Sequence, residues 1–194
     1  MFFGKKSAAW LVVFLGNPGA KYADTRHNVG FAAADVIGKT HGVKINKLKY
    51  SALTGSGSLG GQQVFLMKPQ TFMNLSGDAV RQAMSFYKIP LSNVIAVADD
   101  VSLPAGKLRI RGQGSHGGHN GLRDIIAKCG GDGFPRVKIG VGAPPHPDYD
   151  LADWVLSKPA GEDARLIGDA IARAAEAVET IIASGVDRAM NRFN

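Results

Sequence analysis

Short apolar runs alternate with longer amphipathic segments along the chain. Each run has the length of a β-strand and is bounded by Gly, Pro, Asn or Asp, residues that favour turns. We therefore expect strands at 10–15, 51–59, 63–67, 94–98, 107–111 and 136–141. The segments between them repeat apolar residues at the spacing of a helix. They predict helices at 28–41, 76–88, 120–129 and 162–184.

The order of these elements predicts the fold class. Strands that alternate with helices are typical of α/β proteins. Gly60 and Gly61 form a tight-turn signal between two of the strands, so these two should pair as an antiparallel hairpin and make the sheet mixed. The chain shows no internal repeat, low-complexity tract or linker, so residues 1–194 are expected to form a single domain.

The first apolar run, residues 8–15, follows Lys5 and Lys6, as the apolar part of a secretion signal follows basic residues. A turn signal, Gly-Asn-Pro-Gly at 16–19, comes next instead of a cleavage site. We therefore interpret the run as a buried strand. No apolar stretch reaches the ~18 residues of a membrane span, so no membrane partner is expected.

The charge and the cysteine content indicate which binding partners and which cellular compartment to expect. The formal net charge is +7; residues 1–142 carry 18 Lys/Arg against 7 Asp/Glu, and residues 143–194 carry 5 against 9. A basic body favours a polyanionic partner, although a basic protein without a nucleic-acid partner explains the charge equally well. The single cysteine, Cys129, excludes an internal disulfide framework. This suits a reducing cytosol, and we expect a cytoplasmic protein.

Three loops carry more Gly, Pro and polar residues than a simple connection needs: residues 16–25, 112–119 and 143–148. Sites are often built on such loops. The sequence contains no Gly-x-Ser-x-Gly elbow, no phosphate-binding Gly-x-x-x-x-Gly-Lys-Ser/Thr loop and no His-Glu-x-x-His pair. The chemistry must therefore come from other residue types.

One candidate is a histidine paired with an acid. His27 stands where a helix should begin, and Asp99 and Asp100 end an apolar strand, where α/β sheets form their groove. A histidine is a natural general base near neutral pH, and a carboxylate on its other nitrogen fixes its tautomer. From the residues alone, a helix cap and a surface acid explain the same pattern.

Metal binding and amide chemistry are two further alternatives. His116 and His119, three residues apart, form a candidate metal pair, but a site would need further ligands from Asp99 or Asp100. Asn17, Asn74 and Asn120 each stand where a strand or loop meets a helix. Each is explained by helix capping alone, whereas three around one cleft would suit holding a peptide or polarising an ester carbonyl.

Four blocks of the sequence occur in an order that identifies a family. They are Gly-Asn-Pro-Gly at 16–19 with Tyr22 and Thr-Arg-His-Asn at 25–28, then Lys-Pro-Gln-Thr-Phe-Met-Asn-Leu-Ser-Gly at 68–77, Asp-Asp-Val-Ser-Leu-Pro at 99–104 and Gly-Gly-His-Asn-Gly-Leu-Arg-Asp at 117–124. This series resembles bacterial-type peptidyl-tRNA hydrolases over residues 10–192. The resemblance implies a twisted mixed sheet flanked by helices on both faces, in a monomer that uses no cofactor or metal.

The resemblance also implies an activity. Enzymes of this family are esterases that cut the bond between a peptide, or an N-blocked aminoacyl group, and the 3′-terminal ribose of tRNA, and so recycle tRNA. The expected partner is peptidyl-tRNA, through the tRNA acceptor end and the nascent peptide, with no obligate protein partner.

Roles carry over position by position. His27 matches the general base for water, and Asp99, rather than Asp100, matches the acid that orients it. The remaining matches are to substrate-binding or cleft-wall positions: Asn17, Tyr22, Met73, Asn74, His119 and Asn120.

Basic residues on two expected strands are candidates for tRNA contact. Lys107, Arg109 and Arg111 alternate along one strand, and Arg136 and Lys138 along another, so each set should share one face. Such side chains bind phosphates without reading sequence. Solvated surface charge remains the alternative for each. Two other functions also remain open: a non-catalytic RNA-binding protein on the same scaffold, and a metal-dependent hydrolase.

Overall fold

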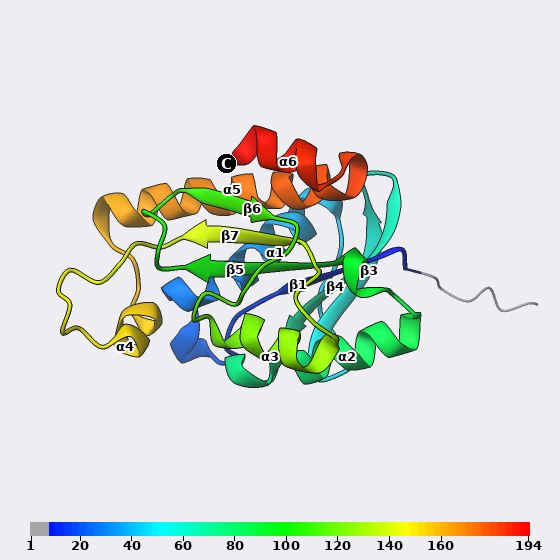
Figure 1. The fold of residues 1–194 in the computed structure, drawn as a ribbon, viewed down its shortest axis with the longest axis horizontal. Helices are drawn as coiled ribbons and strands as arrows, with labels where there is room; N and C mark the ends of the chain where they lie inside the picture. Colours follow the sequence, from blue (N-terminus) through cyan, green and yellow to red (C-terminus); the bar gives the residue numbers. More distant parts are fainter. Residues whose placement is uncertain (1–7) are drawn as a thin grey trace, which may run out of the picture.

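The computed structural model describes residues 8–194, and within them seven strands form one mixed sheet (Figure 1). The strand order is β2-β3-β4-β1-β5-β7-β6. The strands are β1 (Trp10–Phe14), β2 (Lys47–Lys49), β3 (Ala52–Leu59), β4 (Gln62–Pro69), β5 (Val94–Asp100), β6 (Leu108–Arg111) and β7 (Arg136–Gly140). The helices are α1 (Val29–His41), α2 (Ser76–Tyr87), α3 (Asn120–Cys129), α4 (Leu151–Leu156), α5 (Gly161–Ser184) and α6 (Val186–Phe193). Short 3-10 turns are η1 (Ala20–Tyr22), η2 (Arg26–Asn28), η3 (Met73–Leu75) and η4 (Leu91–Asn93).

The centre of the sheet is parallel and its edges are antiparallel. Strand β1 pairs in parallel with β4 and β5, and β5 pairs in parallel with β7. The pairs β2·β3, β3·β4 and β6·β7 are antiparallel. The predicted hairpin between β3 and β4 is confirmed, because Gly60 and Gly61 both adopt positive φ angles, 54° and 78°.

Helices cover both faces of the sheet, as expected for this fold class (Figure 1). Strand β1 shows why: Val12 and Phe14 pack on the side of α1, α5 and α6, whereas Leu11 and Val13 pack on the side of α2 and α3. All four side chains are fully buried. A strand that is apolar on both sides needs cover on both faces, and this confirms the interpretation of the first apolar run as a buried strand.

The predicted strands and helices are confirmed with ends shifted by one or two residues. Strand β5 continues through Asp99 and Asp100, and Lys107 lies just outside β6.

One strand, β2, and two α-helices, α4 and α6, were not predicted. Strand β2 is three exposed residues, α4 is a helix of six residues after a proline-rich loop, and α6 is separated from α5 by Gly185 alone. Patterns of this length carry too few positions to define a periodicity.

Within residues 8–194, no helix combines the length and the hydropathy needed to cross a bilayer.

Helix α1 approaches the sheet so closely that one position in it excludes a side chain. A Cβ on Gly30 would lie 2.3 Å from the carbonyl oxygen of Leu15 and 2.8 Å from that of Val97. Gly30→Ala should therefore lower the free energy of unfolding by about 1–3 kcal/mol, measured by urea denaturation. Gly168→Ala on α5 is the matched control, because nothing lies within 4 Å of its added Cβ. It should stabilise by about 0.5–1 kcal/mol. Equal effects of the two changes would contradict this packing.

Candidate active site

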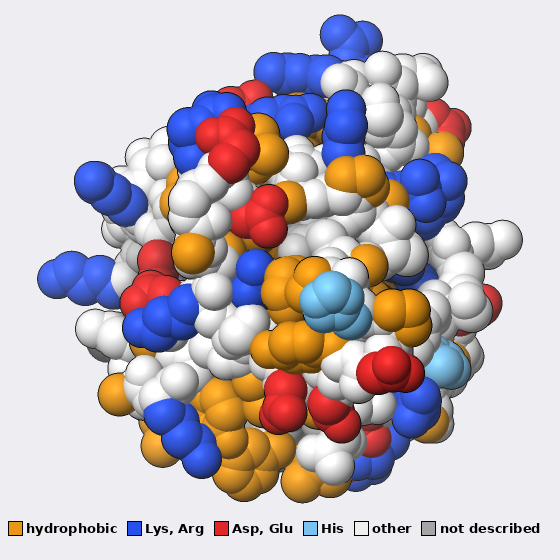
Figure 2. Space-filling model, turned by 90° about the vertical axis from the view of Figure 1, so that its left-hand side faces the viewer, with side chains coloured by type: hydrophobic (Ala, Val, Ile, Leu, Met, Phe, Trp, Pro, Cys, Tyr) orange, Lys and Arg blue, Asp and Glu red, His pale blue; other side chains and the backbone are white. Residues whose placement is uncertain are grey.

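A cleft of about 510 Å³ opens where β1 and β5 end. Strand β5 delivers Asp99 and Asp100, the loop after β1 delivers Asn17, η2 carries His27, and His119 caps the start of α3. Apolar side chains form a patch near the middle of this end of the molecule, with Asp and Glu side chains beside it (Figure 2). The cleft is lined by Asn17, His27, Phe72, Met73, Asn74, Asp99, Asp100, Val101, His116, Gly117, Gly118, His119, Asn120, Lys138, Leu151, Ala152, Val155 and Leu156.

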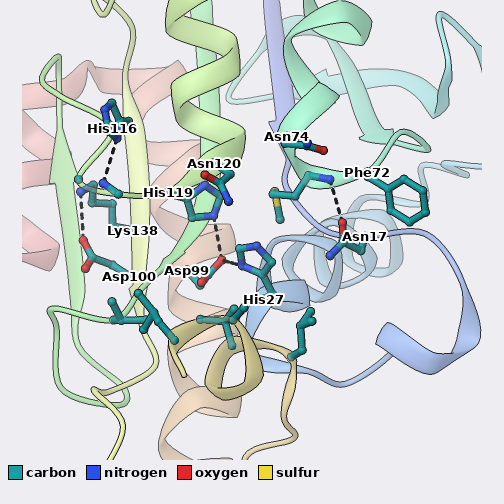
Figure 3. A pocket seen from close by; sticks show the side chains of 18 residues that line it. Asn17, His27, Phe72, Asn74, Asp99, Asp100, His116, His119, Asn120 and Lys138 are labelled. Atoms are coloured by element: carbon teal, nitrogen blue, oxygen red, sulfur yellow. Dashed lines mark hydrogen bonds and ion pairs between the residues drawn. The ribbon is translucent and has the colours of Figure 1, made fainter. Parts of the chain in front are cut away.

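Two histidines converge on one carboxylate oxygen (Figure 3). His27 Nδ1 lies 2.8 Å and His119 Nε2 lies 2.9 Å from Oδ1 of Asp99. His119 Nδ1 accepts the backbone N–H of Leu122, so the proton of the His119 ring belongs on Nε2, which donates to Asp99. His27 likewise donates from Nδ1, so in the neutral form of its imidazole Nε2 carries no proton.

The surroundings of the three side chains, His27, Asp99 and His119, lower the pKa of Asp99 and raise the pKa of His27. Burial disfavours the charged form of Asp99, but attraction to His27 and His119 and their hydrogen bonds outweigh it and hold the pKa of Asp99 well below its usual range. Burial also disfavours the cationic form of His27. The charge and hydrogen bond of Asp99 outweigh that effect and raise the pKa of His27 above its ordinary value. Asp99 is therefore a carboxylate at neutral pH.

Asn17 connects the cleft to two other segments, η2 and η3. Its Oδ1 accepts the backbone N–H of Met73 at 2.8 Å. Its own backbone N–H donates to Asn28 Oδ1 at 2.9 Å, and Asn28 Nδ2 donates to the carbonyl of Asn17 at 3.0 Å. The bond from Met73 fixes the side-chain amide, and the two bonds with Asn28 fix the backbone. The remaining donor, Asn17 Nδ2, is therefore held in place at the cleft without a hydrogen bond to any residue between 8 and 194.

Further amide donors lie at the starts of α2 and α3. Asn74 belongs to η3, which leads into α2, and Asn120 is the first residue of α3; both line the cleft (Figure 3). The backbone N–H groups of Asn120 and Gly121 make no hydrogen bond with the described residues. Free N–H groups at a helix start carry partial positive charge, which suits an oxygen that becomes negative.

Helix α4 supplies the apolar side of the cleft. Leu151, Val155 and Leu156 line it together with Met73 from η3. Met73 is buried, whereas Leu151, Leu156 and the neighbouring Phe72 are exposed. Exposed apolar side chains around a concave polar site are typical of a ligand surface.

The basic residues divide into three groups. Lys107, Arg109 and Arg111 are exposed. Lys138 lines the cleft and forms an ion pair with Asp100 at 3.0 Å. Arg136 stands apart from both.

The expectation that Arg136 belongs to an exposed basic face is wrong, because its side chain is 1% exposed. The register pairs Arg111 with Arg136 across β6 and β7, so alternation placed it correctly on the sheet. The glycine-rich loop covers it, and its guanidinium donates to the carbonyls of Gly114, Ser115, Asp132 and Phe134. Arg136 is therefore a structural residue that holds this loop.

Two other expectations concern the cleft wall and a metal. Tyr22 lies in η1 and is not among the residues that line the cleft.

The candidate metal pair of His116 and His119 is not formed, because His116 accepts the N–H of Gly118. Among the residues that the structure describes, the group with metal-ligand spacing is instead His27, Asp99 and His119, whose ligand atoms lie within 4.8 Å of one another. A metal there would replace the two protons that now join the imidazoles to Asp99.

The sequence did not single out Asn28 and Arg26. In the structure Asn28 bonds Asn17, and Arg26 bonds Ser157. Both are buried polar side chains beside His27. Two buried polar residues flanking a candidate base are a recognisable signal, but only the structure shows their partners. The fold and the cleft, with a histidine on a buried carboxylate and amide donors around it, are those of a hydrolytic enzyme built on an α/β scaffold.

Comparisons with known proteins identify the family. The family model for peptidyl-tRNA hydrolase matches residues 11–194. A peptidyl-tRNA hydrolase of Caldanaerobacter subterraneus subsp. tengcongensis is 50% identical over 185 residues, 95% of this chain and 99% of that protein. One from Thermoanaerobacter sp. (strain X514) is 48% identical over 185 residues, with the same coverage. The crystal structure of peptidyl-tRNA hydrolase from Acinetobacter baumannii superposes with a TM-score of 0.88 and 35% identity, covering 97% of this chain and 96% of that one.

The chain belongs to the peptidyl-tRNA hydrolase family, and its activity is the hydrolysis of peptidyl-tRNA.

The pKa of His27 can be followed directly by NMR titration of the imidazole resonances. It should lie above 6.5 in the wild type. Asp99→Asn removes the charge that raises it and leaves burial, so the pKa should then fall below 6.5. Asp100→Asn is the control, because Asp100 bonds Ser102 and Lys138 and should leave His27 unchanged. An unshifted His27 in Asp99→Asn would contradict the electrostatic coupling.

Proposed function

We propose that His27 is the general base that activates water for attack on the ester carbonyl of peptidyl-tRNA. The observation that supports this is the shared Oδ1 of Asp99, which bonds both His27 and His119 at hydrogen-bonding distance. That arrangement holds the imidazole of His27 with Nδ1 protonated and Nε2 facing the cleft as a base. Asp99 orients the ring and stabilises the imidazolium that forms during the attack.

The reaction then needs no covalent intermediate. Water attacks the carbonyl carbon and gives its proton to Nε2 of His27. The tetrahedral intermediate collapses with cleavage of the bond to the ribose oxygen, and the 3′-hydroxyl leaves with a proton returned by His27. An ester is a better electrophile than an amide, so a positioned base that contributes roughly 10²–10⁴-fold is sufficient.

Amide groups are proposed to hold the acyl part of the substrate. Asn17 Nδ2 and the side chains of Asn74 and Asn120 are uncharged donors and acceptors that match a peptide backbone. The free N–H groups at the start of α3 are suited to the negative oxygen of the intermediate. Recognition through backbone groups predicts that peptides of different sequence are accepted.

The tRNA is proposed to meet the basic residues at the other side of the cleft. Arg109, Arg111 and Lys107 are exposed at the β6 edge, and Lys138 links this edge to the cleft. Arg136 is left out of this surface because its guanidinium is already bonded to four carbonyls. Phosphate contacts of this kind position the acceptor end without reading its sequence. We place this activity in the cytoplasm, where translation generates the substrate.

Replacing the base tests the proposal. His27→Ala should lower the turnover of N-acetyl-aminoacyl-tRNA by at least about 10²-fold, while deacylated tRNA binds as before, because the imidazole contributes to chemistry more than to binding. The assay follows release of labelled acyl group with and without a chelator. Turnover that persists in His27→Ala would remove His27 from the role, and loss of wild-type turnover with chelator would favour the metal-dependent alternative.

Neutralising the β6 edge tests the tRNA surface. Changing Lys107, Arg109 and Arg111 to Gln should weaken tRNA binding and flatten the plot of log K against log salt, by about 0.7–0.9 for each phosphate that the protein no longer neutralises. The control removes the same number of charges at the opposite edge of the sheet, through Lys44, Lys47 and Lys49, which are also exposed. Equal salt slopes for the two triple variants would place the tRNA elsewhere.

A further inference from the structure

Arg26, the residue before the proposed base, has an unusual environment for an arginine. It is 4% exposed. The centre of its guanidinium lies 3.7 Å from the centroid of the Trp154 ring, and its Nη1 donates to Ser157 Oγ at 2.7 Å. Asp163 lies 3.7 Å from Nη2. One side chain of η2 therefore meets a residue of α4, the residue that follows α4 and a residue of α5.

The backbone makes the same connection. The N–H of Arg26 donates to the carbonyl of Ser157 at 3.0 Å, directly after α4. Trp154 Nε1 donates to the carbonyl of Gly142 at 2.8 Å, and Ser157 Oγ donates to the carbonyl of Trp154 at 2.7 Å. Among the described elements, η2 is the main packing partner of α4. The position of α4 thus depends on the turn that carries His27.

The burial of Arg26 is costly and only partly compensated. Burial lowers the pKa of its guanidinium, because loss of solvation outweighs the attraction of Asp163. Its Nε lies buried without a hydrogen-bond partner among the described residues, and the side chain of Asp163 is 44% exposed. An apolar side chain of similar size is often as stabilising in such a place, so a buried cation here calls for a role beyond stability.

We infer that Arg26 is a positioning residue that sets the apolar wall of the cleft relative to the base. Its stacking on Trp154 holds α4 so that Leu151, Val155 and Leu156 face the cleft opposite His27. The peptide of the substrate then lies against this wall with its ester carbonyl in reach of the activated water. This inference rests on the proposed role of His27.

The test combines kinetics with the local environment of Trp154. In a Trp10→Phe background Trp154 is the one tryptophan, and its exposure is measured by acrylamide quenching of fluorescence. Arg26→Met should raise quenching of Trp154 and lower kcat/KM for peptidyl-tRNA about 10-fold or more. Arg26→Lys keeps a cation over the ring and should stay within about 3-fold of the parent. Trp154→Leu, assayed with Trp10 in place, should reproduce the kinetic loss of Arg26→Met.

Arg165→Met is the matched control, because Arg165 is an exposed arginine on α5 that pairs with Glu162 and Asp169. It should change neither readout. A lower melting temperature for Arg26→Met with unchanged kcat/KM and unchanged quenching at 25 °C would overturn the inference and leave Arg26 a purely structural residue. Wild-type kinetics in Trp154→Leu would overturn it as well. The quenching result does not depend on turnover, so it stays readable even if His27→Ala retains activity and the proposed base fails.

Discussion

A buried negative charge is the constraint on which the rest of the site depends. Asp99 is 4% exposed, and an unpaired carboxylate in that place would cost several kcal/mol. The charge is stabilised because His27 and His119 donate to the same oxygen from two different elements. The carboxylate, the turn η2 and the start of α3 are therefore fixed together. Removing either histidine leaves a charge that is only half compensated.

The asparagine network extends this fixed region on the side away from Asp99. Asn17 bonds Asn28 through the backbone and Met73 through the side chain. Asn28 is next to His27, so the end of β1, the turn η2 and the turn η3 cannot shift independently. The side chains that line the cleft are thus held by a second layer of contacts, the kind of support that keeps a site aligned within about 0.5 Å.

The sequence predicts the fold class, most of the elements and the residues of the triad individually. Strand β1 is apolar at every position, and this alone indicates a central strand covered on both faces. The sharing of one Asp99 oxygen could not be predicted, because it depends on where the loop before α3 places His119. Arg136 shows the same limit: alternation gives its face of the sheet, but not the loop that covers it. Helix α4 is too short to show a period, so the apolar wall and its contact with Arg26 emerge only in three dimensions.

The parallel centre of the sheet also affects how the chain folds. Within residues 8–194, the strands that pair with β1 are β4 and β5, which follow far along the sequence. A nascent chain therefore carries an entirely apolar strand that has no strand to pair with until residues 62–69 and 94–100 have been made. Pairings of such long range are slow to form and leave strand edges exposed to aggregation in the meantime. His27 and Asp99 are 72 residues apart in the chain, so this hydrogen-bonded pair cannot assemble before the middle of the sheet does.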